Sequence, residues 1–133
     1  MLAKSTPIRL IPIKDLDRAL KFYTETLGGK LGMRGEGDMK DSWASVTINK
    51  VEFWLIEPEK HEKAELAYNA FLVGDIKATV SGLKKKGIKF EPPEEGKDIK
   101  VDGPIAEMSW GAKSAFFKDS EGNLLMLWEQ SMD

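Results

Sequence analysis

Residues 13–20, "IKDLDRAL", are repeated as "VGDIKATV" at residues 73–80, a constant offset of 60 residues. A second pair of segments, "FWLIE" (53–57) and "LMLWE" (125–129), follows in the same order at an offset of 72. Two independent features that recur in one order indicate that the chain contains two copies of one structural module. The larger second offset places the additional residues of the second copy in a Pro/Gly/charge-rich segment, 91–112.

The first copy is predicted to fold as a strand, a helix and three further strands. Residues 8–13, "IRLIPI", form a short apolar strand, Asp15 is placed to cap a helix, and Gly28-Gly29 ends that helix. An apolar stripe at helical spacing runs along it, formed by Leu16, Ala19, Leu20, Tyr23 and Leu27. The three strands are "KLGMRGEG" (30–37), "WASVTI" (43–48) and "VEFWLIE" (51–57), with Asn49-Lys50 as the tight turn of a hairpin.

The second copy repeats this order after a charged connector. Its strand is "AYNAFLV" (67–73), Asp75 is its N-cap, and Gly87 closes its helix. The helix stripe consists of Ile76, Thr79, Val80 and Leu83. We expect "IKF" (88–90) to begin a strand, residues 91–112 to form a loop, and "KSAFFK" and "NLLMLWEQ" to form a hairpin around "DSEGN".

These patterns predict an α+β fold, a single domain of residues 1–133 built from two tandem βαβββ modules with curved mixed sheets. Module one covers about residues 6–57, the connector is 58–66, and module two covers about 67–130. In each module the helix covers only one face of the sheet. We therefore expect the sister modules to face each other around a shared cleft.

The composition excludes several classes of function. The net charge of −2 does not provide the basic surface that nucleic acid requires, and the absence of cysteine excludes disulfides, thiolate zinc sites and cysteine nucleophiles. No signal-peptide core is recognisable, and no apolar run approaches the roughly 18 residues of a membrane span. We therefore expect a cytoplasmic protein without a membrane or nucleic-acid partner. The only histidine, His61, lies in the charged connector and is interpreted as solvated.

Three segments together resemble the vicinal oxygen chelate superfamily, which contains glyoxalase I, extradiol dioxygenases and bleomycin-resistance proteins. They are "IPIKDLDRALKFYTETLGG" (11–29), "FLVGDIKATVSGLKKKGIKF" (71–90) and "SWGAKSAFFKDSEGNLLMLWE" (109–129). The resemblance covers nearly the whole chain. It implies a glyoxalase-like fold and a homodimer, but it is less specific for activity, because this scaffold supports several chemistries.

The resemblance also implies four metal-ligand positions, two in each module, which are usually His or Glu in the metal-dependent relatives. In this chain those positions carry Ile8, Trp54, Tyr68 and Met126. Within two residues of these positions the only strong metal-ligand side chain is Glu52. Because a divalent transition metal needs about three or four N, O or S ligands, we expect a member without a metal or other cofactor.

Strand alternation places a set of apolar and aromatic side chains on the concave face, away from the helices. This candidate ligand-binding set comprises Ile8, Leu10, Trp43, Trp54, Tyr68, Met126 and Trp128. Phe53, Leu55, Leu125 and Leu127 alternate with them and are expected to face the helices. The alternative is that the set simply forms core. The Trp and Tyr side chains would also keep an N–H or O–H group that can orient a ligand.

Glu52 has the same strand parity as Trp54, and it completes the candidate binding set. One interpretation is a solvated carboxylate at the edge of a strand. If it instead faces the cleft among aromatic rings, it becomes a candidate for a catalytic acid or base, or an anchor for a cationic ligand. No other catalytic residue is predicted.

The sequence therefore favours a metal-free protein, resembling the bleomycin-resistance branch, that sequesters an aromatic or apolar small molecule, a cationic one included. Burial of about 300 Å² of apolar ligand surface would contribute roughly 7 kcal/mol before the costs of association. Three alternatives remain open. They are a glyoxalase- or dioxygenase-like lyase, isomerase or oxidoreductase with an atypical metal site, a metal-free enzyme with Glu52 as base, and an interaction module with a closed cleft.

Overall fold

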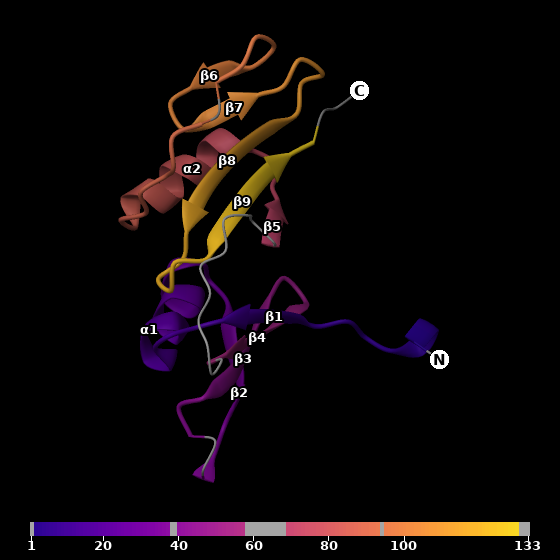
Figure 1. The fold of residues 1–133 in the computed structure, drawn as a ribbon, viewed down its shortest axis with the longest axis vertical. Helices are drawn as coiled ribbons and strands as arrows, with labels where there is room; N and C mark the ends of the chain where they lie inside the picture. The colour runs from indigo at the N-terminus through magenta and orange to yellow at the C-terminus, as the bar shows by residue number, and fades with distance from the viewer. Residues whose placement is uncertain (1, 38–39, 58–68, 94, 131–133) are drawn as a thin grey trace. The chain divides into compact units, whose positions relative to one another are not determined.

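The computed structural model of the chain describes residues 2–37, 40–57, 69–93 and 95–130, and Figure 1 shows its fold. It consists of two compact units, Met1–Glu62 and Lys63–Asp133, so their boundary lies within the connector expected at residues 58–66. Two residues discussed above, His61 and Tyr68, lie outside the described residues. Each unit contains one mixed sheet and one main helix, which confirms the predicted α+β fold class.

The sheet of the first unit has the strand order β1-β4-β3-β2. The strands are β1 (Arg9–Pro12), β2 (Lys30–Arg34), β3 (Trp43–Ile48) and β4 (Val51–Ile56). β1 pairs with β4 in parallel, whereas β4 with β3 and β3 with β2 are antiparallel. Asn49 and Lys50 form the turn between β3 and β4, both with positive φ, as the hairpin prediction required. A short 3-10 turn, Leu2–Lys4, precedes this sheet.

The helix of the first unit begins at its predicted cap. The Asp15 side chain accepts a hydrogen bond from the backbone N–H of Arg18 at 3.1 Å, and α1 (Leu16–Lys21) follows. The sequence predicted one uninterrupted helix, but from Phe22 to Thr26 the chain forms a π-helical turn. The hydroxyl of Thr24 donates to the carbonyl of Leu20 at 2.6 Å at this transition.

Gly29 follows this turn in a position that admits no side chain. A Cβ atom there would lie 2.6 Å from Cγ1 of Val46 and 2.8 Å from the carbonyl oxygen of Tyr23. Both neighbours belong to fully buried residues. The end of the helix therefore approaches the sheet closely, and glycine is needed for that contact rather than for an unusual φ angle.

The sheet of the second unit has the order β5-β9-β8-β7-β6. Its elements are β5 (Asn69–Leu72), α2 (Ile76–Lys85), β6 (Lys100–Asp102), β7 (Ile105–Glu107), β8 (Lys113–Lys118) and β9 (Leu124–Glu129). β5 pairs with β9 in parallel, and the other pairs are antiparallel. The Asp75 side chain caps α2 through the backbone N–H of Ala78 at 3.1 Å, and Gly87 follows the helix with φ of +92°.

The segment between α2 and β8 differs from the prediction. Residues 88–90 do not begin a strand, and Phe90 makes only an isolated bridge with Phe117. The next residues include Pro92 and Pro93, which lack the N–H group that would continue a ladder. Within the segment predicted to be a loop, β6 and β7 form an additional hairpin, and β7 occupies the place in the sheet that β2 has in the first unit.

The pairing register reproduces the sequence repeat. Arg9 pairs with Phe53 in the first unit, and Asn69 pairs with Leu125 in the second. The first members of these pairs are separated by 60 residues and the second members by 72. Because the same offsets relate all four paired positions along β1–β4 and β5–β9, the two units are structural copies.

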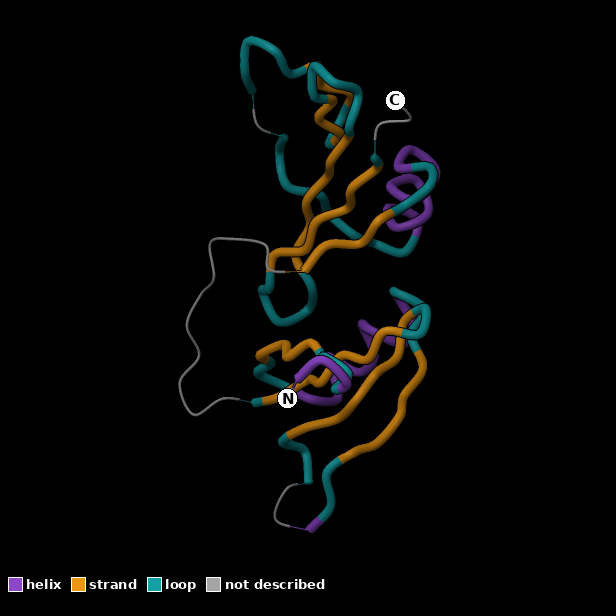
Figure 2. Tube along the Cα trace, turned by 90° about the vertical axis from the view of Figure 1, so that its right-hand side faces the viewer, coloured by secondary structure: helices purple, strands orange, loops and turns teal. Residues whose placement is uncertain are grey.

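In each unit the helix lies against one face of the sheet. α1 contacts β3 and β4, and α2 contacts β8 and β9, as Figure 2 shows for each unit separately. The helix-facing side chains are buried, among them Phe53, Leu55, Leu125 and Leu127, as the strand alternation predicted. The residues that alternate with them on β4 and β9 are only partly buried, so each sheet has one covered and one open face. In the described residues, no helix has the length and apolar character of a membrane span.

Candidate functional site

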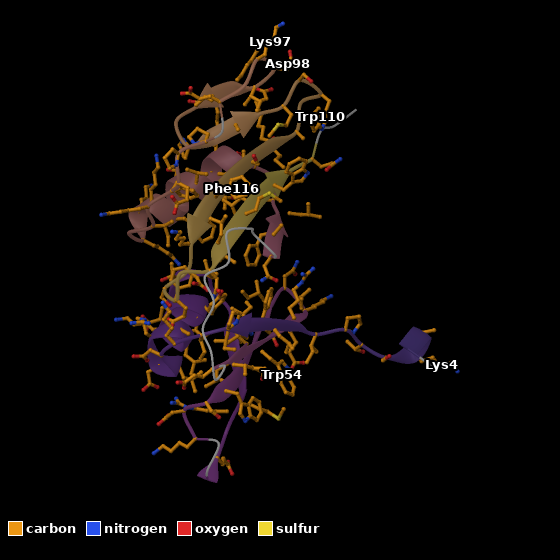
Figure 3. All side chains as sticks on the ribbon, viewed as in Figure 1. Lys4, Trp54, Lys97, Asp98, Trp110 and Phe116 are labelled. Carbon is orange, nitrogen blue, oxygen red and sulfur yellow. The ribbon has the colours of Figure 1, made fainter. Side chains whose placement is uncertain are left out.

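Two tryptophans form a stacked pair on the open face of the first sheet. Trp43 on β3 and Trp54 on β4 have ring centroids 5.1 Å apart and an interplanar angle of 18°. Trp54 lies directly opposite Ser45 in the ladder, so the two indoles are diagonal neighbours, a separation that large aromatic side chains can bridge. Trp54 is labelled in Figure 3. The arrangement is a stacked aromatic pair, in which each indole covers part of one face of the other.

Glu52 holds one member of this pair in place. Its carboxylate oxygen Oε1 accepts a hydrogen bond of 2.7 Å from Nε1 of Trp54, and its side chain is partly buried. It is therefore neither the freely solvated residue of the first interpretation nor an unengaged base. In the described structure this hydrogen bond helps to position the Trp54 indole against Trp43.

The groove next to Trp43 is wide and open. It has a volume of about 860 Å³ and is lined by the β2–β3 connection, mainly Gly32, Met33, Arg34, Gly35, Glu36, Gly37 and Lys40. Nη2 of Arg34 donates to Asp17 and to Asp41, at 2.8 Å in each case. These hydrogen bonds raise the pKa of Arg34 and link the groove wall to α1. The groove mixes charged and apolar groups and encloses little of its volume.

The remaining predicted residues of the first unit are exposed. Leu10 on β1 is 60% exposed, and Ile8, which precedes that strand, is 40% exposed. Leu10 pairs with Trp54 in the parallel ladder, so it borders the aromatic pair. Ile8 lies outside the paired strand, and no described contact joins it to the tryptophans.

The open face of the second sheet contains a smaller and more enclosed pocket, which we call the Met126 pocket. It has a volume of about 120 Å³ and is lined by Pro93, Pro104, Ala106, Met108, Ser114, Phe116, Met126 and Trp128. All of these residues belong to the second unit, and Phe116 is labelled in Figure 3. Two predicted site residues, Met126 and Trp128, are thus brought together with six that were not predicted.

The missed residues have different origins. Ser114 and Phe116 alternate on β8 with the helix-facing Ala115 and Phe117, so strand parity alone could have identified them. Pro104, Ala106 and Met108 come from the β6–β7 hairpin, whose short strands carry no clear periodicity in the sequence. Trp110, at the end of the same segment, is 61% exposed and projects from the unit in Figure 3.

The indole N–H groups of the two sheet tryptophans correct one expectation. Nε1 of Trp54 donates to Glu52, and Nε1 of Trp128 donates to Oε1 of Gln130 at 2.7 Å. Both groups are engaged within the chain rather than available to orient a ligand. The ring faces and carbon edges remain as the contact surfaces of these side chains.

The residues at the implied metal positions do not suit a metal. Ile8 has a hydrocarbon side chain, the indole nitrogen of Trp54 is an N–H donor, and the Met126 thioether lies in an apolar wall. Among the described residues, no group of three or more His, Cys, Asp or Glu side chains converges as metal ligands would. The fourth position, Tyr68, falls outside the described residues. The donor set therefore does not fit the transition-metal chemistry that the resemblance associates with catalysis.

Comparison with solved structures finds chains with the same fold. A glyoxalase family protein from Enterococcus faecalis has 23% identity and a TM-score of 0.73, covering 97% of this chain and 100% of that one. TnmS3, an antibiotic binding protein from Streptomyces sp. CB03234, has 20% identity and a TM-score of 0.65, with coverages of 96% and 98%. A lactoylglutathione lyase from Agrobacterium tumefaciens has 14% identity and a TM-score of 0.69, with coverages of 98% and 97%. At these identities the likeness shows the fold alone.

Comparison at the level of sequence identifies the family. No curated protein sequence matches the chain. A family model, described as the Glyoxalase/Bleomycin resistance protein/Dioxygenase superfamily, matches residues 7–127. Since this match includes both structural copies and nearly all of the described strands, the chain belongs to the glyoxalase/bleomycin resistance protein/dioxygenase superfamily.

Proposed function

We propose that the protein is a metal-free binding protein that sequesters an aromatic or apolar small molecule. The observation that carries the proposal is the Met126 pocket. At a position where the metal-dependent relatives are expected to hold an ion, this chain places a thioether in an enclosed apolar wall with Phe116 and Trp128. Such a wall binds by burial and ring contact rather than by coordination.

The side chains that line the pocket suit aromatic ligands of different shapes. Phe116 and Trp128 offer ring surfaces, which favour offset or edge-to-face contacts with a ligand ring. Met108 and Met126 are unbranched and polarisable, so they adapt to an irregular ligand shape. The pocket is therefore better suited to hold an apolar group than to position a reacting bond.

The stacked tryptophans provide a second aromatic surface, on the other unit. Trp43 and Trp54 are preorganised by their mutual contact and by the hydrogen bond from Trp54 to Glu52. A surface that is ordered before binding loses less conformational entropy when the ligand arrives. The antibiotic-binding description of TnmS3, a chain of the same fold, is compatible with this use of the scaffold.

Direct titration of the full chain tests the proposal. Calorimetry with a library of aromatic compounds is performed on the wild type, on Met126→Glu and on Val51→Glu. Val51 is exposed on β4, so it controls for the addition of a carboxylate to a strand. We expect saturable binding to the wild type and to Val51→Glu. Met126→Glu should bind at least tenfold more weakly, because an unpaired charge is unfavourable in an apolar pocket.

Two outcomes would contradict the proposal. One is the absence of saturable binding across the library, and the other is unchanged binding by Met126→Glu. Elemental analysis of untagged protein provides an independent test. One tightly held zinc, nickel, manganese or iron ion per chain would favour the metal-dependent alternative.

A further inference from the structure

We infer that the Met126 pocket is selective for one ring-sized apolar group that carries a single hydrogen-bonding atom, and that the hydroxyl of Ser114 recognises that atom. A phenol is the simplest ligand group with this chemistry. The inference rests on the proposed binding function and deepens it, because it assigns the polarity of the bound group and the residue that selects it.

The volume of the pocket sets the size of the group. At about 120 Å³ it is somewhat smaller than the ~150 Å³ apolar cavity that is known to admit benzene. One six-membered ring with a small substituent matches this space, whereas a fused polycyclic system would extend beyond it. The pocket is therefore a subsite for one ring of a ligand or for a small aromatic compound.

Ser114 is a buried polar group without a partner in the described structure. Ser114 is only 3% exposed, and it lies in the pocket lining between apolar side chains. Among the described residues, none forms a hydrogen bond with its hydroxyl. Trp128, which is paired with Ser114 in the ladder, already donates its indole N–H to Gln130. A buried hydroxyl in this state is unfavourable, and a ligand that supplies a partner removes the penalty.

A second buried serine, Ser45 on β3 of the first unit, provides a contrast with Ser114. Ser45 is also 3% exposed and lies opposite a tryptophan, Trp54, although in the repeat Ser114 corresponds to Trp43 rather than to Ser45. However, the Ser45 hydroxyl oxygen accepts a hydrogen bond from the backbone N–H of Met33 at 2.8 Å.

The neighbouring strands explain the difference. The pairing of β2 with β3 shifts register between Leu31 and Arg34, and this irregularity directs the Met33 N–H towards Ser45. In the second unit β7 pairs regularly with β8, with Ala106 opposite Ser114. No bulge therefore supplies a backbone donor, and the hydroxyl is left for a ligand.

A trapped water is a poor substitute for the ligand atom. A buried water is held by about two to four polar partners, whereas the side chains that line this pocket offer one hydroxyl among hydrocarbon, aromatic and thioether groups. The thioether sulfurs are only weak acceptors. A ligand group with an apolar ring and one polar atom packs against the apolar lining and also forms a hydrogen bond with the Ser114 hydroxyl.

The test uses two probes that differ by one hydroxyl, benzene and phenol, titrated into the full chain by calorimetry and by ligand-observed NMR. We expect the wild type to bind phenol about tenfold more tightly than benzene. Ser114→Ala should lose this preference, and Ser45→Ala, a buried serine on the other sheet, should retain it as the control. Binding of neither probe would overturn the ring-sized subsite, whereas the library titration described above separately tests the proposed function. Binding of benzene without a preference for phenol, or a preference that survives in Ser114→Ala, would overturn the role of Ser114.

A measurement without ligand provides a second readout. Urea denaturation should show that Ser114→Ala is at least as stable as the wild type, because the substitution removes an unpaired buried hydroxyl. Ser45→Ala should be less stable, because it removes the acceptor of the Met33 N–H. If Ser114→Ala is destabilised as much as Ser45→Ala, the hydroxyl is already satisfied in the free protein, and the inference is wrong.

Discussion

The contact between Trp43 and Trp54 should contribute measurably to the stability of the first unit. Their ring centroids are 5.1 Å apart, within the range in which aromatic pairs contribute about 0.5–1.5 kcal/mol beyond the burial of their surface. Both side chains are partly buried, so water competes for part of each ring face. We therefore expect a coupling free energy in the lower half of that range, about 0.5–1 kcal/mol.

A double-mutant cycle isolates this quantity. The free energy of unfolding in urea is measured for the wild type, Trp43→Leu, Trp54→Leu and the double variant, because leucine keeps an apolar side chain while it removes the ring. The control cycle combines Trp43→Leu with Val51→Ala, since Val51 lies at the opposite end of the β3–β4 hairpin. Unlinked sites add within about 0.3–0.5 kcal/mol. A Trp43–Trp54 coupling no larger than that of the control cycle would refute the stacked arrangement.

Two further predictions concern a side-chain contact and the close approach of the backbone. Glu52→Gln should lower the free energy of unfolding by about 1 kcal/mol and shift the tryptophan emission, because the Trp54 N–H exchanges a charged acceptor for a neutral one. The control Glu57→Gln, at an exposed strand end, should change neither quantity. Equal effects in the two variants would contradict the positioning role of Glu52. Gly29→Ala should lower the free energy of unfolding by about 2–4 kcal/mol, because the added methyl group overlaps a backbone carbonyl and a buried valine. Gly82→Ala, in open space within α2, should raise it by about 0.5–1 kcal/mol. Urea denaturation compares the two variants, and a tolerated Gly29→Ala would disprove the close contact at Gly29.

Much of the fold could be read from the chain because its signals are local. Asp15 and Asp75 were predicted as N-caps from their place before an apolar stripe, and both side chains accept the expected backbone hydrogen bond. The offsets of the repeat predicted two copies of one module, and the structure shows the same parallel pairing in both, β1 with β4 and β5 with β9. Strand alternation also separated the buried, helix-facing side chains from the partly buried ones.

The errors occur where structure depends on partners distant in the sequence. The β6–β7 hairpin forms next to β8, and its three-residue strands are too short to show a period of their own. The π-helical turn at Phe22–Thr26 accompanies the close packing of Gly29 against the sheet, which no spacing of apolar residues reveals. The strand predicted at residues 88–90 is a different error, because Pro92 and Pro93, which follow it closely, are a local signal against a continued ladder.

Some features of the candidate site follow from the linear sequence, and others depend on contacts between distant segments. The sequence by itself determined that two βαβββ copies are present, which residue types occupy the implied metal positions, and which strand faces the helices leave uncovered, because composition, repeats and strand parity are properties of the linear chain. Only the tertiary structure decided which hydrogen bonds form: Trp54 donates its N–H to Glu52, and Trp128 donates its N–H to Gln130. It also decided that the Ser114 hydroxyl lacks a backbone partner like the one that Ser45 has. Hydrogen bonding and enclosure depend on which strand lies beside which and in what register, and those neighbours are fixed by the folded chain.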